Sequence, residues 1–87
     1  MATASPSPTP NPDAMKYTLD GPLASPMNVA SAEAAAAEGN EFAVAVFAVE
    51  GVASVFGTAD FVTVTRRPGA EWGPITAAVQ AAAAEHL

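Results

Sequence analysis

The segment Phe42–Arg67 constrains the fold more than any other part of the sequence, because it holds all four phenylalanines and most of the valines. Gly51 and Gly57 divide this segment into three apolar pieces. None of these pieces hides its apolar surface from water alone, so the three must fold against one another. The segment therefore describes a hydrophobic core, and it contains no catalytic motif.

The first of the three pieces is predicted to be a helix that starts after Asn40 and runs to about Glu50. Asn40 is a common N-cap residue. Apolar residues then recur at spacings of three and four, as on one helical face: Phe42, Ala45, Val46 and Val49. The alternation of β-prone residue types also fits a buried strand. Gly51 favours the helix, since a glycine directly after the last periodic residue is the usual left-handed stop.

Four strands are predicted around this helix. The runs Val52–Phe56 and Phe61–Arg66 fit a hairpin whose turn is Gly57–Asp60. Upstream, alternating apolar residues predict a strand over Met15–Leu19, and we expect an irregular strand over Pro26–Ala30. All four segments are short, which is usual for an antiparallel sheet.

Two further helices are predicted from their capping residues. Ser31 is a suitable N-cap for a short alanine-rich helix over Ser31–Glu38, and Gly39 would end it. Pro74 suits the first turn of a final helix, with Trp72 as an anchor just before it. One face of this helix is apolar and would pack on the sheet: Ile75, Val79, Ala82, Ala83 and Leu87.

The predicted fold class is α+β, in two layers, with helices on one face of an antiparallel four-stranded sheet. Its element order is strand, strand, helix, strand, strand, helix, within a single domain over residues 1–87. The first twelve residues alternate proline with small polar residues, and we expect residues 1–8 to form a disordered arm. A short domain of this kind buries roughly 60% of its unfolded surface.

Composition excludes several classes of function. Nine acidic residues against three basic ones give a net charge of −6, which repels phosphate backbones and anionic membranes. No apolar run is long enough to span a bilayer, and the first residues do not resemble a secretion signal, so we expect a cytoplasmic protein. The chain contains no cysteine, which excludes thiolate ligands and cysteine nucleophiles.

Few side chains are candidates for chemistry. Glu50 and Asp60 flank one predicted strand and are weak candidates for a shared divalent-cation site. His86, the only histidine, is better explained as a charge that complements the C-terminus of the last helix. Lys16, Arg66 and Arg67 would form a small basic spot for an acidic partner if their strands are neighbours. We expect no enzymatic activity and no cofactor.

Two elements of the sequence resemble a known family. Thr9–Tyr17 is similar to an opening element Thr-x-Asn-Pro-(three residues)-Lys-aromatic, and Phe47–Thr65 is similar to that family's central block. The family is the N-terminal domain of the Nfu/NifU-like iron-sulfur scaffold proteins, and the resemblance extends over Thr9–Leu87. It implies an α+β fold with helices on one face of the sheet, and an ordered arm from Thr9 onward with a turn at Asn11.

The resemblance also limits the expected function. In this family a Cys-x-x-Cys pair in a separate C-terminal domain holds the cluster, and no such pair is present in this chain. The resemblance therefore implies a stand-alone accessory domain that contacts a Cys-x-x-Cys scaffold or iron-sulfur client proteins in trans, as a monomer. The alternative is a protein that binds iron or another divalent metal through carboxylates. Candidate motif or partner-binding residues are Thr9, Asn11, Pro12, Lys16, Gly51, Gly57, Asp60, Arg66 and Arg67.

Overall fold

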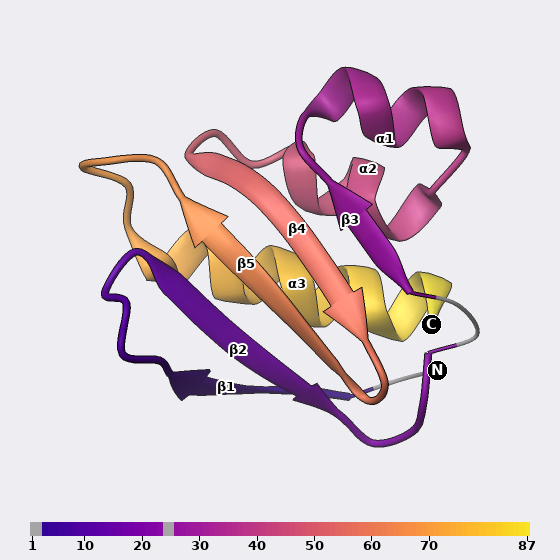
Figure 1. Cartoon of the computed structure of the whole chain (residues 1–87), viewed down its shortest axis with the longest axis horizontal. Helices are drawn as coiled ribbons and strands as arrows, with labels where there is room; N and C mark the ends of the chain where they lie inside the picture. The colour runs from indigo at the N-terminus through magenta and orange to yellow at the C-terminus, as the bar shows by residue number, and fades with distance from the viewer. Residues whose placement is uncertain (1–2, 24–25) are drawn as a thin grey trace.

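The computed structural model describes residues 3–23 and 26–87 as a five-stranded antiparallel sheet with three helices (Figure 1). Across the sheet the strands are ordered β1-β2-β5-β4-β3, so the central strand comes from the last hairpin of the chain. The strands are β1 (Ala4–Pro8), β2 (Ala14–Leu19), β3 (Met27–Val29), β4 (Val52–Thr58) and β5 (Phe61–Arg66). The helices are α1 (Ala32–Glu38), α2 (Glu41–Phe47) and α3 (Trp72–His86).

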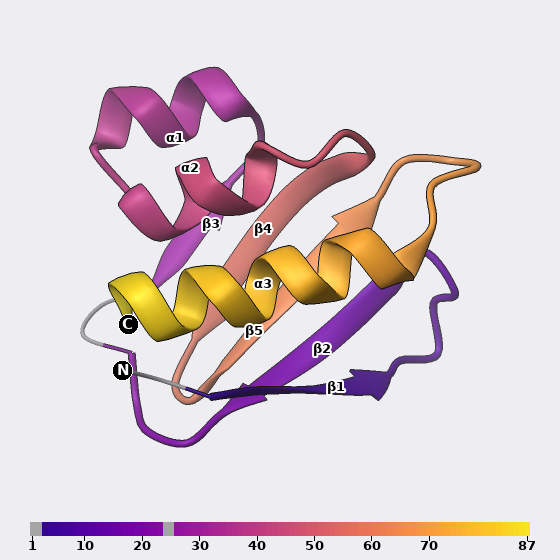
Figure 2. The same ribbon diagram turned by 180° about the vertical axis from the view of Figure 1, so that it is seen from behind.

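The helices cover one face of the sheet only. Helix α3 crosses that face, as the view from behind shows (Figure 2), and α2 packs against both α3 and β4. Helix α1 lies beside β3 at the edge of the sheet and packs on α2. The predicted α+β class with helices on one face is therefore confirmed.

The core lies between α3 and two rows of side chains on the covered face of the sheet. The strand register places Val29, Val55 and Val64 in one row and Tyr17 and Val62 in the next. All five side chains are fully buried. From the helices, the buried contributions are Ala35, Phe42, Ala43, Val46, Ile75, Val79, Ala82 and Ala83.

The prediction of four strands is wrong, and so is that of a disordered arm over Ala4–Pro8, because this segment forms a fifth strand beside β2. The part of the predicted arm at residues 1–2 lies outside the described residues. Prolines are tolerated in an edge strand when their nitrogens face away from the neighbouring strand. Pro6 lies opposite Tyr17, and since proline has no amide hydrogen this must be a pair without mutual hydrogen bonds. Buried Ala4 and the bond from Gln80 Nε2 to the Ala4 carbonyl oxygen (3.2 Å) also hold the strand against α3.

The helix predicted over Asn40–Glu50 ends earlier than expected. Helix α2 ends at Phe47, and the amide of Val49 already bonds to the carbonyl oxygen of Val46, three residues back. That tighter bond begins the turn that leads into β4. Gly51 does have a positive φ (101°), as predicted, but it lies in this turn and not at the end of the helix. The predicted element order is wrong as well, since it lacks β1 and counts one helix where α1 and α2 both separate β3 from β4. The separate prediction of a short helix over Ser31–Glu38 agrees with α1.

Gly57 was predicted to lie in the hairpin turn, and the structure places it inside β4. The turn consists of Ala59 and Asp60 alone, with Thr58 opposite Phe61. Gly57 faces the covered side of the sheet, where an added Cβ would lie 2.9 Å from Met27 Cγ and 3.0 Å from Leu23 Cδ1. A side chain at this position would collide with the core, which is why glycine occupies it.

Candidate interaction surfaces

The opening Thr-x-Asn-Pro element forms the turn between β1 and β2. The Thr9 hydroxyl oxygen lies 2.8 Å from the carbonyl oxygen of Asn11 and 2.9 Å from that of Ala14. It also accepts a bond from the Asn11 amide (3.2 Å), while Asn11 Oδ1 accepts one from the amide of Asp13 (2.9 Å). A short asparagine side chain that bonds its own backbone two residues on is a common turn device. The expected turn at Asn11 is confirmed.

This turn is fixed to the start of α3 through Arg66. The guanidinium of Arg66 bonds to Asp13 Oδ1 (3.2 Å) and to the carbonyl oxygen of Ala70 (3.0 Å), and it lies over the Trp72 ring at 5.3 Å. Trp72 Nε1 in turn donates to the carbonyl oxygen of Pro12 (3.3 Å). Thr9, Asn11 and Pro12 of the opening element are thus held, directly or through Asp13, to Arg66 and Trp72 at one corner of the fold.

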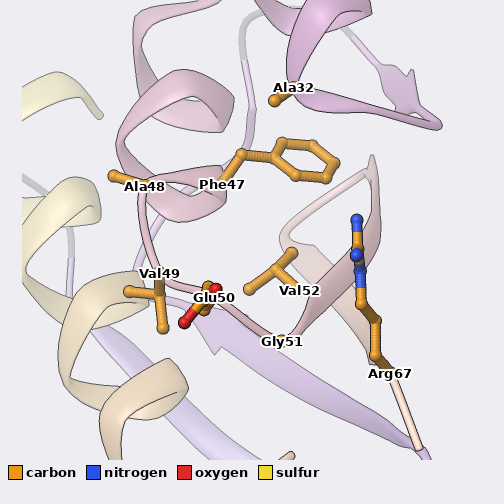
Figure 3. A pocket seen from close by; sticks show the side chains of 8 residues that line it. All are labelled: Ala32, Phe47, Ala48, Val49, Glu50, Gly51, Val52 and Arg67. Carbon is orange, nitrogen blue, oxygen red and sulfur yellow. The ribbon is translucent and has the colours of Figure 1, made fainter.

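A surface pocket of about 160 Å³ lies between the end of α2 and the start of β4 (Figure 3). The guanidinium of Arg67 stands on one side of it, the ring of Phe47 lies near the top of the view, and the Glu50 carboxylate is turned away from Arg67. The backbone amide of Arg67 bonds to the carbonyl oxygen of Gly51 (2.6 Å), which ties the two walls together. The lining residues are Ala32, Phe47, Ala48, Val49, Glu50, Gly51, Val52 and Arg67.

The face of the sheet opposite the helices is uncovered. Among the described residues of that face none is buried, and Phe56 is 43% exposed. Within the described strands there is no aspartate or glutamate, so this face carries hydroxyls, two phenylalanines and one cation, Lys16. Lys16 Nζ lies 4.5 Å from the centre of the Phe61 ring. On an acidic chain, this is a surface without negative charge.

The structure does not bring Glu50 and Asp60 together. They lie beyond opposite ends of β4, whose seven residues span about 23 Å. Within residues 3–23 and 26–87 there is also no cluster of three His, Asp or Glu side chains that would hold a metal. A shared cation site for these two carboxylates is thus excluded by distance.

The three cations do not form the predicted basic spot either. β2 does pair with β5, but Lys16 belongs to the uncovered face, whereas Arg66 belongs to the covered face and is paired with Asp13. Arg67 follows β5 and lines the pocket. His86 lies 3.5 Å from Glu41 and 3.6 Å from Glu85, so its contacts join the end of α3 to the start of α2.

Two features of the site were missed by reasoning from the sequence. Asp13 was not singled out as the partner of Arg66, because no local pattern pairs residues 53 positions apart. Phe47 was counted with the core, whereas it is half-buried and lines the pocket. Its spacing contained no signal for this, because it lies one helical turn after the buried Ala43 and still packs against the core.

The family model for the N-terminal region of the scaffold proteins Nfu/NifU matches residues 5–87. The chain belongs to this family. The Nfu N-terminal family connects the chain with iron-sulfur cluster biology. The resemblance seen in Thr9–Tyr17 and Phe47–Thr65 is therefore confirmed.

Solved structures share this Nfu N-terminal fold. The crystal structure of the Staphylococcus aureus protein SAV1430 is 28% identical, with a TM-score of 0.76 over 92% of this chain and 96% of that one. Its solution structure is 27% identical, with a TM-score of 0.68 over 94% and 89% of the two chains. A Staphylococcus epidermidis protein is 30% identical, with a TM-score of 0.66 over 98% of both. No curated protein matches the chain.

The residues of this Nfu N-terminal domain do not fit an iron-sulfur cluster. Clusters are held mainly by cysteine thiolates, and the sequence contains none. The described part of the chain also offers no convergent histidines or carboxylates in their place. None of its described helices is both long and apolar enough to cross a membrane.

Proposed function

We propose that this Nfu N-terminal domain is a non-catalytic accessory module that contacts partner proteins during iron-sulfur cluster assembly or delivery. The observation that carries the proposal is the family match over residues 5–87 in a chain without cysteine. Without thiolates the chain has no means of holding a cluster in the usual way. The chain must then contribute to cluster assembly through another protein, which supplies the thiolates.

The surface supports a role in protein contact better than a role in catalysis. The described residues include no buried charged side chain and no group of three His, Asp or Glu side chains that could hold a metal, whereas active sites commonly contain buried titratable groups. The uncovered sheet face, by contrast, exposes Phe56 and lacks acidic side chains. Partners proposed on this basis are a Cys-x-x-Cys scaffold protein or iron-sulfur client proteins, which the chain meets as a monomer.

The alternative of carboxylate-based metal binding receives no support from the geometry. The two carboxylates on which it depended, Glu50 and Asp60, are separated by the length of β4. Two isolated carboxylates also provide too few oxygens for Ca²⁺ or a similar cation, which takes six to eight.

The proposal is tested by affinity purification of the tagged full chain from extracts of its own cells, followed by quantitative mass spectrometry. We expect enrichment of cluster-assembly factors or iron-sulfur proteins over an untagged control. A second control is a tagged, unrelated acidic domain of the same charge, which removes proteins that bind by charge alone. If the proteins retained by the chain contain no iron-sulfur protein or assembly factor, the proposal is wrong.

A further inference from the structure

Among the described residues, Arg67 differs from the other two cations of the chain in making neither an ion pair nor a cation–π contact. Arg66 is occupied by Asp13, the Ala70 carbonyl and the Trp72 ring, and Lys16 lies over Phe61. Within residues 3–23 and 26–87 the guanidinium of Arg67 makes no hydrogen bond or ion pair, although the chain has nine carboxylate side chains. Its five donors therefore remain available for a ligand.

The pocket beside Arg67 has the size of one side chain. Pockets for metabolites and cofactors usually measure about 300–1,000 Å³, well above the 160 Å³ found here. Its walls differ in character: Arg67 offers a charge on one side, and Phe47, Ala32 and Val52 offer apolar surface. A side chain with a carboxylate at its tip and methylene groups behind it matches both walls.

The negative charge around the pocket indicates which kind of partner segment carries this carboxylate. Glu50 also lines the pocket, with its carboxylate turned away from Arg67, and the whole chain has a net charge of −6. A strongly acidic segment would be repelled by this field. Basic residues on either side of the carboxylate would instead be attracted to it, and one of them would meet Glu50.

We propose that this pocket receives a glutamate side chain from an otherwise basic segment of a partner protein, with Arg67 binding its carboxylate and Phe47 packing on its methylenes. The inference rests on the proposed function, since it names the chemistry of the partner. A guanidinium binds a carboxylate through two parallel hydrogen bonds. The contact therefore selects the orientation of the carboxylate as well as its charge.

The test is a nuclear magnetic resonance titration of the ¹⁵N-labelled full chain with a short synthetic peptide in which one central Glu is flanked by Lys and Leu. We expect amide shifts that concentrate at Phe47–Val52 and Arg67. The same peptide with Gln in place of Glu, and the variant Arg67→Gln, each lower the affinity about tenfold, because the charge-assisted bonds are lost. Arg67→Lys keeps the positive charge but loses the planar pair of donors, so it should bind the peptide with intermediate affinity.

Lys16→Gln is the matched control, since it removes one positive charge from the opposite face and leaves the affinity unchanged. Equal affinity for the Glu and Gln peptides, or equal loss in the Lys16 and Arg67 variants, overturns the proposal. Sodium acetate that shifts the same amides as strongly as the peptide also overturns it, because the site would then serve a free small carboxylate. The amide spectrum of each variant shows directly whether it is folded.

The outcome is separable from that of the proposed function. If the peptide fails to bind while iron-sulfur proteins are still retained by the wild-type chain and by Arg67→Gln alike, only the pocket is excluded. If the peptide binds at Arg67 but no iron-sulfur protein is retained, the pocket stands and its assignment to cluster assembly is wrong.

Discussion

Ala59 occupies the left-handed region of backbone space, with φ at 52°, in the two-residue turn between β4 and β5. An L-residue other than glycine pays roughly 1–2 kcal/mol to adopt this conformation. Glycine avoids that cost but loses more freedom on folding, about 0.5–1 kcal/mol. We therefore expect Ala59→Gly to raise the free energy of unfolding by about 0.5–1 kcal/mol, measured by urea denaturation.

Ala81→Gly is the control for that prediction. Ala81 is exposed within α3, where glycine lowers the stability by about 1 kcal/mol. The two alanine-to-glycine substitutions should thus change stability in opposite directions. A loss of stability in both would show that the turn does not hold Ala59 in the left-handed region.

Tyr17 links stability to alkaline pH. Burial raises the pKa of its hydroxyl above 10.0, and the hydrogen bond to Thr76 Oγ1 (2.9 Å) opposes this shift less strongly. Below about pH 10 the hydroxyl is protonated in both folded and unfolded chains, so the stabilisation is fully present. Above this pH the unfolded chain loses the proton while the folded chain still holds it. The stabilisation is therefore lost as the pH rises through the higher pKa of the folded chain.

We predict that Tyr17→Phe unfolds with a flatter dependence on pH above about 10 than the wild type does. Near neutral pH the variant is less stable by about 1 kcal/mol, because one hydrogen bond is lost. Since Tyr17 is the only tyrosine, its phenolate absorbance reports the titration directly. An equal slope for both proteins above this pH would contradict the assigned pKa direction.

Local signals made several residues predictable from sequence. Ser31 accepts from the Ala34 amide, Asn40 accepts from that of Ala43, and Gly39 takes a φ of 66° at the end of α1. Each of these roles depends on neighbours within four residues. The position of Gly57 was predicted wrongly because a glycine in a turn and a buried glycine in a strand look alike in sequence. Only the tertiary contacts with Met27 and Leu23 show that Gly57 is of the second kind.

At the scale of elements, β1 shows how proline protects the edge of a sheet. An edge strand normally exposes amide donors that pair with other chains. In β1 the outward position Pro6 has no such donor. We expect Pro6→Val to restore it and to increase self-association at high concentration, seen as a rise in sedimentation coefficient. Ser5→Val is the control, because it adds an equal β-branched side chain at a position that already has an amide. Equal association by both variants would contradict this role of Pro6.

The turn that carries Gly51 packs closely on the segment that follows β5. A Cβ at Gly51 would lie 2.7 Å from the Cβ of Ala70, and φ at this residue is 101°. We predict that Gly51→Ala lowers stability by about 2–4 kcal/mol, from overpacking and backbone strain together. Adding Ala70→Gly relieves the contact but not the strain, so the double variant should recover only part of the loss.

Gly21→Ala is the control for this pair, since open space surrounds that residue and its φ is not in the left-handed region. Urea denaturation of the wild type, Gly51→Ala, Ala70→Gly and the double variant gives the coupling energy between the two positions. A coupling near zero would mean that Gly51 and Ala70 do not touch in solution.

Elements differed in how well their sequences revealed them. The hairpin strands and α3 were predictable because their apolar spacing is long enough to establish a period. β1 was not, since its five residues contain two prolines, and Ala4 is the only buried residue among Ala4–Ser7. What makes it a strand is the Thr9–Asp13 turn, which aligns it with β2.

At the scale of the whole molecule, charge is segregated by secondary structure. The acidic residues lie in turns, at helix ends or on helix surfaces, and none lies in a described strand. This arrangement leaves one sheet face uncharged apart from Lys16, and it leaves Arg67 beside the pocket without an ion pair to any residue that the structure describes. Composition predicted the net charge but not its distribution, because the distribution depends on which strands pair.

The proposed function is that this domain serves iron-sulfur proteins without holding a cluster. The most direct measurement is the activity of an iron-sulfur dehydratase in extracts of cells that lack the gene for this chain, assayed before and after anaerobic treatment with ferrous iron and sulfide. We predict a lowered activity in these extracts. The treatment restores it, and expression of the full chain also restores it. Equal activity with and without the gene, at equal amounts of the enzyme, would contradict it.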